Sequence, residues 1–454
     1  MGFTAELAEF IAGIRYEELS REIVIKSNEA FLDWLGVTLA ATVEESGRLI
    51  VDFVVRNGGG GLAPVAGTAV KTSASDAALA MGTLSHALDF DDIYWPMTGH
   101  PSVTILPAIF ALGGETGAGG KKVIEAFVAG FEVEAIIGEA TSEYHYHRGW
   151  HTTGTIGPLG SAAACAKLLG LNRSEIINAL GIAASHASGL RQNFGTMTKP
   201  LHAGNSARAG VVAALLAKSG FTADESILEA ELGFANVFCG KGIHRLGPAA
   251  MEKAGKTWAL LNPGRTVKKY PSCGCTAAAI DCILDIRLES RLMPSDIELI
   301  ECLVSPKATG ILIRNRPFTG LEGKFSMQYC LAVAVLDGEV GLKQFTDERV
   351  CREDVQGLIS KVSLIGHPLY ERLGQASVRI STGSGLFEKE TDYSRGSPEN
   401  PMTYQEMKDK FMMCSEGVIS HEAAAGLEEM ISCLEGIDDI RTLTEKCYNR
   451  KSLD

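Results

Sequence analysis

The chain has 454 residues, of which 46% are hydrophobic and 21% are charged. This composition is typical of a packed soluble protein, and the length predicts two domains rather than one. The formal net charge of −13 disfavours binding to nucleic acid or to an anionic membrane surface, although a few buried cations could still bind a small anion.

The first half of the chain has the periodicity of successive helices. Apolar residues recur at helical spacing over residues 4–55 and again from about 73 to 220, and a glycine-rich connector lies at 57–68. Asn172 is placed to cap one of these helices. The abundant glycine and alanine predict that the helices pack closely.

The pattern changes near residue 265. After a helix over 276–290, period-2 alternation is typical of half-buried antiparallel strands. These strands are expected at residues 296–306, 361–368, 376–385 and 386–393, with a helix at 328–340 among them. Helical sequence returns near residue 400, where Thr403 and Glu406 have the spacing of a capping box.

These elements predict a mainly α protein with an α+β insertion: a large all-helical domain built from both ends of the chain and a smaller α+β domain. The expected boundaries are residues 1–266 for the first part of the helical domain, 267–396 for the α+β domain and 397–454 for a helical tail that rejoins the first domain.

The cysteines and the first residues of the chain indicate the cellular compartment. The eleven cysteines show no CxxC pairs or regular spacing and have mostly apolar neighbours, which favours reduced thiols. The first residues lack the basic and apolar segments of a signal peptide. The apolar run around Pro107 is too short to span a membrane. We therefore expect a cytoplasmic protein that does not enter a membrane.

Residues 86–102, HALDFDDIYWPMTGHPS, bring two histidines and three aspartates together within apolar sequence. Acid–base chemistry needs titratable groups of both kinds, held close together in surroundings that shift their pKa values. Three further segments carry groups of the same kind: GWHTTGTIG with His151, MTKPLHAGN with Lys199 and His202, and VKKYPSCGC with Lys268 and Lys269. Together they indicate a pocket that moves protons on an anionic small molecule, with Lys199, Lys268 and Arg191 as candidate cations.

Each segment also has a structural interpretation. The histidines and aspartates of residues 86–102 could be helix caps and hydrogen-bonded core groups, and the paired lysines could mark a simple hinge. Lys199 could lie at the surface, or beside free backbone N–H groups if a helix begins near Gly204. Tyr329 lies in an apolar segment with Lys324 and could bind a ligand or fill the core.

Two other kinds of site fit the sequence poorly. The segment GGETGAGGKK, residues 113–122, departs from the phosphate-loop pattern GxxxxGK[ST], and we expect a loop between two helices there. The histidines and aspartates could in principle hold a metal ion, but no spacing matches a strong metal motif such as HExxH. We therefore expect neither a phosphate loop nor a catalytic metal at these residues.

Taken together, these segments resemble the MmgE/PrpD family, whose known activities include 2-methylcitrate dehydratase, cis-aconitate decarboxylase and iminodisuccinate epimerase. The resemblance spans roughly residues 5–415, in the order of the family. It is carried by HALDFDD and GHPS, WHTTGTIGPLGSAAA, TKPLHAGNSARAG, KKYPSCG, TGLEGKFSMQYCLA and RGSPENPM. It implies the same helical domain and α+β lid, a homodimer, and no metal or organic cofactor.

The resemblance also implies pocket positions. Carried over residue by residue, these are Asp89, His100, His151, Lys199, Lys268 and Tyr329. The chain departs from the family at two places. Ile93 stands where a threonine often follows the DFDD motif in the decarboxylases and dehydratases. Cys273, Gly274, Cys275 and Thr276 stand where many relatives have a histidine shortly after the YP motif.

We therefore expect a cofactor-independent lyase, of dehydratase or decarboxylase type, that acts on a small di- or tricarboxylate such as methylcitrate or cis-aconitate. His100 and His151 would be acid and base, Asp89 would tune a histidine, and Tyr329 would donate a hydrogen bond. Lys199 and Lys268 would bind carboxylate, with His202 and Arg191 as further binding candidates. The two departures favour an alternative, an epimerase of an imino- or amino-dicarboxylate; a non-catalytic binding protein and a metal hydrolase are further alternatives.

Overall fold

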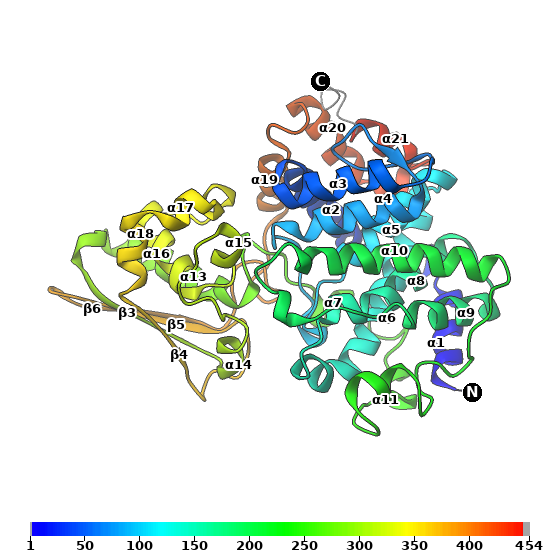
Figure 1. Ribbon diagram of the computed structural model, residues 1–454, viewed down its shortest axis with the longest axis horizontal. Coiled ribbons are helices and arrows are strands. Elements are labelled where there is room, and N and C mark those ends of the chain that lie inside the picture. The colour runs from blue at the N-terminus through cyan, green and yellow to red at the C-terminus, as the bar shows by residue number, and fades with distance from the viewer. Residues whose placement is uncertain (1, 448–454) are drawn as a thin grey trace.

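The structure, a computed structural model, describes residues 2–447. Figure 1 shows a large helical body beside a smaller body that contains the sheet. The first part of the helical body consists of α1 (Phe3–Gly13), α2 (Arg21–Ala40), α3 (Glu45–Asn57), α4 (Ala74–Ala87), α5 (Ser102–Thr116), α6 (Gly120–His147), α7 (Thr152–Thr155), α8 (Gly157–Leu168), α9 (Arg173–Ala184), α10 (Thr198–Lys218), α11 (Phe234–Cys239) and α12 (Pro248–Met251). A two-stranded pairing of β1 (Ala63–Pro64) with β2 (Lys71–Thr72) lies in the glycine-rich connector.

The chain returns to this body through α19 (Tyr404–Ser415), α20 (His421–Ser432) and α21 (Arg441–Lys446). Helices α19 and α20 pack against the N-terminal helix α2, and α21 packs against α5 and α20 (Figure 1). Phe411, Leu427 and Leu443 are buried in the same hydrophobic core as Phe31 and Trp34. The two ends of the described chain therefore share one core.

The smaller body has a mixed sheet covered by helices. Its elements are α13 (Ala277–Ser290), β3 (Ile297–Val304), α14 (Pro306–Thr309), α15 (Gly320–Gly323), α16 (Met327–Asp337), α17 (Asp347–Cys351), α18 (Glu353–Ile359), β4 (Val362–Gly366), β5 (Ala376–Thr382) and β6 (Gly385–Thr391). The strand order is β4-β3-β5-β6. Strand β5 pairs antiparallel with β3 and with β6, in agreement with the period-2 alternation, whereas β3 and β4 are parallel, which the alternation did not predict. The helices between β3 and β4 form the crossover that a parallel pair requires.

The mainly α class with a smaller α+β part is confirmed. A second hydrophobic core runs from Tyr270 to Ile380 and also takes in Tyr146 and Phe194. The domain boundaries at residues 266 and 396 remain a prediction. None of the helices in residues 2–447 combines the length and the hydrophobicity that crossing a membrane requires.

The close packing of helix α4 against helix α10 brings together two segments that carry site residues. A Cβ added to Gly82 on α4 would lie 2.8 Å from the Cα of Gly204 on α10, so only glycine permits this spacing. Helix α10 begins at Thr198, not near Gly204 as expected. Pro200 falls in its first turn, where the missing N–H of proline is not needed. Lys199 and His202 therefore lie three residues apart on the N-terminal turns of one helix.

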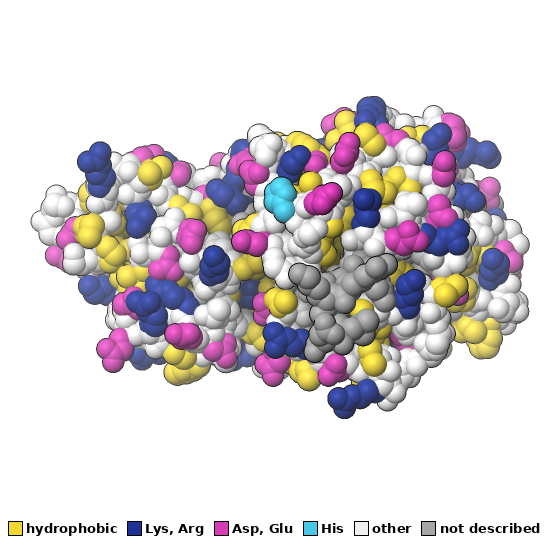
Figure 2. All heavy atoms as spheres, turned by 90° about the horizontal axis from the view of Figure 1, so that it is seen from above, with side chains coloured by type: hydrophobic (Ala, Val, Ile, Leu, Met, Phe, Trp, Pro, Cys, Tyr) yellow, Lys and Arg dark blue, Asp and Glu magenta, His cyan; other side chains and the backbone are white. Residues whose placement is uncertain are grey.

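On the face drawn in Figure 2, basic and acidic side chains alternate over both bodies and do not gather into one stripe. The surface on this side thus has no extended basic patch of the kind that nucleic acid binds.

Candidate active site

A small cavity of 40 Å³ is lined by residues of both the helical body and the smaller body. Its charged and histidine residues come from four places in the chain. Asp89 and His100 follow α4, His151 directly precedes α7, Lys199 is on α10, and Lys268 lies on the segment that leads to α13. The rest of its wall is Ile93, Trp95, Thr98, Gly99, Tyr146, Phe194, Cys273, Gly274, Cys275, Ile311 and Phe325. Segments far apart in sequence thus converge on one site.

Two lysines share one carboxylate oxygen at this cavity. The Nζ atoms of Lys199 and Lys268 lie 2.8 and 2.7 Å from Oδ1 of Asp89. All three residues are buried. Burial alone would raise the pKa of Asp89, but the two ammonium groups outweigh it and hold that pKa well below its usual range. The cavity therefore has a fixed carboxylate and two cations beside it.

The ammonium groups keep donors for a ligand. An ammonium group has three N–H donors. Lys199 uses one for Asp89 and otherwise faces the rings of Phe194 and Phe325, at 5.3 and 4.9 Å. Lys268 uses two, for Oδ1 and the backbone carbonyl of Asp89. Among the described residues, three N–H donors thus have no acceptor, which suits a carboxylate.

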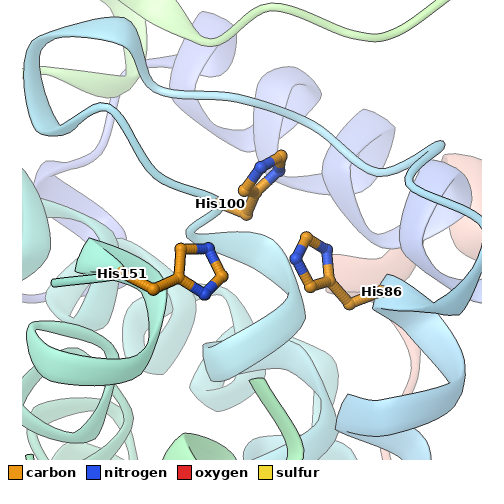
Figure 3. Close-up of side chains that lie close together, drawn as sticks. All are labelled: His86, His100 and His151. Atoms are coloured by element: carbon orange, nitrogen blue, oxygen red, sulfur yellow. The ribbon is translucent and has the colours of Figure 1, made fainter. Parts of the chain in front are cut away.

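Three histidine rings meet at the same place, as Figure 3 shows. The centroid of the His86 ring lies 4.5 Å from that of His100 and 5.8 Å from that of His151. The centroids of His100 and His151 are 6.4 Å apart. Behind this group, Nδ1 of His151 lies 3.1 Å from Nδ1 of His202, so one of these rings donates a hydrogen bond to the other.

Three of these histidines, His86, His151 and His202, are held neutral. Burial lowers the pKa of His86 to about 3, and burial together with the Lys199 ammonium lowers the pKa of His202 to about 4. The same causes, burial first and then Lys199, depress the pKa of His151 well below its ordinary value. A neutral imidazole is the form that can accept a proton, so these rings are available as bases, and their lowered pKa values make them weak ones.

The structure places the predicted site residues at four locations. Asp89, His100, His151, Lys199 and Lys268 line the cavity, and His202 contacts His151 from behind. Arg191 lies outside, where its guanidinium stacks 3.8 Å from the ring centroid of Tyr146 and donates to the carbonyl of that residue. The structure does not bring Tyr329 to this group: its buried hydroxyl donates to the carbonyl of Gln344 in the second core.

A larger cavity of 780 Å³ adjoins the small one. The two share Trp95, Thr98, Tyr146 and Ile311 as walls. Arg191 and His147 line the larger cavity together with residues of the smaller body such as Lys307 and Arg372. It forms a vestibule between the bulk surface and the buried histidines.

Sequence reasoning missed two residues of the site, His86 and Asp91. Nδ1 of His86 lies 3.0 Å from both carboxylate oxygens of Asp91. Both residues stood in the segment already singled out, but its spacing did not reveal which aspartate meets which histidine. In the sequence, Lys324 was named only as a polar residue in an apolar segment. In the structure it is buried, and its ammonium group donates hydrogen bonds to the carbonyl oxygens of Leu88 and Pro271. These bonds connect the segment after α4 with the segment that leads to α13.

Three histidines could in geometric terms hold a metal ion. Ligand atoms of His86, His100 and His151 lie within 4.8 Å of one another. Two lysine ammonium groups border the same cavity, and their charge opposes a bound cation. The residues present therefore fit an anion better than a metal.

Comparison with known proteins gives the family. The family model of the MmgE/PrpD N-terminal domain matches residues 5–246, and that of the MmgE/PrpD C-terminal domain matches residues 270–436. The chain belongs to the MmgE/PrpD family. The resemblance identified from the motifs is thereby confirmed.

Named MmgE/PrpD-type relatives align over most of their length. Cis-aconitate decarboxylase of Homo sapiens is 28% identical over 462 residues, which cover 97% of this chain and 93% of the relative. The enzyme of the same name from Aspergillus terreus (strain NIH 2624 / FGSC A1156) is 26% identical over 470 residues, covering 98% and 95%. 2-Methylcitrate dehydratase of Salmonella typhimurium is 25% identical over 426 residues, covering 87% and 84%. The names of these relatives agree with the expected class, an enzyme of lyase type.

Proposed function

We propose that this protein is a cofactor-independent lyase that acts on a small di- or tricarboxylate, such as methylcitrate or cis-aconitate, by moving a proton on a carbon next to a carboxylate. One observation carries the proposal: Lys199, Lys268, His100 and His151 line a single buried cavity. The names of the relatives, a decarboxylase and a dehydratase, support the same class.

In this proposal the two lysines bind and the imidazoles transfer protons. The three free N–H donors of Lys199 and Lys268 hold a substrate carboxylate, and their charge stabilises the electron density that develops when the neighbouring carbon loses a proton or carbon dioxide. Asp89 keeps both lysines in place. His100 and His151 act as acid and base.

The two lyase reactions differ in what leaves. In dehydration, one imidazole takes the carbon-bound proton and the other donates a proton to the departing hydroxyl group, which leaves as water. In decarboxylation, carbon dioxide departs and the bonding electron pair stays on carbon, which then receives a proton that one imidazole has taken up from solvent. Dehydration needs two proton-carrying groups and decarboxylation needs one, in each case beside a carboxylate-binding group, and the residues that line the cavity include both kinds.

The cavity volume has a consequence for substrate entry. A water molecule needs about 10–15 Å³ of such volume, so 40 Å³ holds only a few waters and not a tricarboxylate. Part of its wall is shared with the 780 Å³ vestibule, and the shared residues come from the helical body (Trp95, Thr98 and Tyr146) and from the smaller body (Ile311). We infer that substrate enters through the vestibule and that the smaller body acts as a lid that moves to enlarge the inner cavity.

A second candidate is epimerisation of an imino- or amino-dicarboxylate. An epimerase needs one group to remove a proton from one face of the carbon and another to return it on the opposite face. The rings of His100 and His151, inclined at 71° with centroids 6.4 Å apart, offer two such groups. Ile93 and Cys273 in the wall of the cavity make it less polar than a tricarboxylate substrate would favour, which supports a substrate with fewer carboxylates.

Proton NMR in deuterated buffer tests both candidates. Purified enzyme is incubated with citrate, methylcitrate, cis-aconitate and aspartate-type acids, and each acid is followed for solvent deuterium and for product. We expect deuterium at a carbon next to a carboxylate in at least one acid, with loss of water or carbon dioxide for a lyase and inverted stereochemistry for an epimerase. The absence of both exchange and product across the panel would contradict the proposal.

A further inference from the structure

Asp91 is buried between two histidines of the site. Its carboxylate lies 3.0 Å from Nδ1 of His86 and 2.8 Å from Nδ1 of His100. Asp91 is 1% exposed, so water does not compete for these contacts. The Asp91 carboxylate thus contacts the Nδ1 atom of each of the two imidazole rings.

These contacts fix where the neutral imidazoles carry their protons. Nδ1 of His100 also lies 2.8 Å from the backbone carbonyl oxygen of Asp92. Both neighbours of this atom are acceptors when Asp91 is ionised, so Nδ1 must carry the hydrogen. The same argument applies to His86, whose Nδ1 faces both oxygens of Asp91. In the neutral rings, Nε2 is then left with a lone pair.

The charge of Asp91 is maintained inside the protein. Burial opposes it, but the contacts with His86 and His100 hold the pKa of Asp91 well below its ordinary value. Lys199 is a further charge that faces His86. Nε2 of His86 is buried and has no hydrogen-bond partner among the described residues, so this acceptor is not consumed by the fold.

We propose that Asp91 is a positioning residue that holds His86 and His100 in the tautomer with hydrogen on Nδ1, so that both rings present Nε2 as proton acceptors in the histidine cluster. The kinetic consequence rests on the proposed function, whereas the tautomers do not. The arrangement corresponds in logic to a carboxylate that orients a histidine base, except that one carboxylate here serves two rings.

Asp92 provides a matched control. It is the next residue, equally buried at 1% exposure, but its carboxylate meets Ser102 and Arg265 and not a histidine. Asp91→Asn replaces one acceptor oxygen by an N–H₂ donor, which cannot accept from Nδ1–H. Asp92→Asn makes the same chemical change at a carboxylate that contacts no histidine.

The test combines ¹⁵N NMR of histidine-labelled protein with kinetics. In the wild type and in Asp92→Asn, we expect the hydrogen of His86 and of His100 to be on Nδ1. In Asp91→Asn, we expect it on Nε2 of at least one of these two rings. The variants His86→Gln and His100→Gln assign the NMR signals to the two residues. With the acid that the deuterium panel identifies, Asp91→Asn should lower kcat by roughly 10²–10⁴-fold with KM within threefold. Asp92→Asn should lower the melting temperature without that loss of kcat.

Hydrogen on Nε2 of His100 in the wild type would overturn the proposal, and this result does not depend on whether Asp91→Asn folds. Equal kcat values and tautomers in Asp91→Asn and Asp92→Asn would overturn it as well. If the wild type shows the expected tautomers but turns over no acid in the panel, the proposed function fails and the positioning of the rings stands.

Discussion

Lys268 binds Asp89 twice: its Nζ atom lies 2.7 Å from Oδ1 and 2.7 Å from the backbone carbonyl oxygen. The two residues are 179 positions apart in sequence and both are buried. Asp89 has a φ of 51°, in the left-handed region that non-glycine residues seldom adopt. The contact joins the end of α4 to the segment that leads into the second core.

Replacement of Lys268 by methionine should impair both folding and turnover. The change removes one buried cation, and we expect kcat/KM to fall roughly 100-fold because one charge that stabilises the reacting carboxylate is lost. The free energy of unfolding should fall by about 3 kcal/mol because a buried ion pair loses one partner. The control is Lys269→Met: Lys269 is the next residue but is 42% exposed. Equal kcat/KM in the two variants would contradict the role of Lys268.

Tyr329→Phe should leave turnover nearly unchanged. The Tyr329 hydroxyl donates to the carbonyl of Gln344 and lies away from the histidine cavity. Its loss should cost about 1 kcal/mol of unfolding free energy, the typical net worth of one hydrogen bond. Steady-state kinetics should give kcat/KM within twofold of wild type; a loss of tenfold or more in a folded variant would restore Tyr329 to the site.

Glu132 on α6 should make stability depend on pH. Burial raises its pKa to about 7, although its carboxylate accepts from the backbone N–H groups of Ala259 and Leu260. The folded state then keeps a proton that the unfolded chain releases near pH 4.5. This contribution is complete below pH 4.5 and is lost as pH rises to about 7, at up to about 1.4 kcal/mol per pH unit.

Glu132→Gln imitates the protonated acid, so its unfolding free energy should lack that decline. Urea unfolding of both proteins at pH 5 and pH 7.5 measures the difference. The buried Glu134, whose pKa is also raised, is present in both proteins and cancels. Parallel pH dependences for wild type and variant would show that Glu132 does not titrate as argued.

Chelation should not abolish activity. The histidine cluster is bordered by Lys199 and Lys268, whose charge opposes a bound cation. We expect dialysis against EDTA to leave kcat within twofold, and added Zn²⁺ to inhibit by competing for the imidazoles that transfer protons. Elemental analysis before dialysis is the companion measurement. Loss of activity that Zn²⁺ or Mn²⁺ restores would support the metal hydrolase instead.

Local signals in the sequence predicted the local structure well. The cap at Asn172 and the capping box of Thr403 with Glu406 are present, since these contacts span only three residues. The loop expected between two helices at 113–122 is also confirmed, as residues 117–119 between α5 and α6. The start of α10 was missed because Pro200 resembles a helix boundary from the sequence but is tolerated in a first turn.

Pairings between distant residues were harder to predict. The segments that carry the site were identified, but nothing in them states that Lys199 meets Asp89 or that Asp91, not Asp89, meets the histidines. Those contacts depend on the packing of α4 against α10 and of one core against the other. Tyr329 lay in a motif of the family, and only the fold shows that its hydroxyl faces Gln344.

The central claim is that an imidazole in this cavity moves a proton on the substrate carbon. The most direct test measures the rate at which wild type and His151→Gln incorporate solvent deuterium into the acid that the panel identifies. The control variant is His421→Gln, because His421 is an exposed residue on α20. We predict that His151→Gln loses exchange at least roughly 100-fold with an unchanged melting temperature, while His421→Gln matches wild type. Exchange by folded His151→Gln at the wild-type rate would contradict the account.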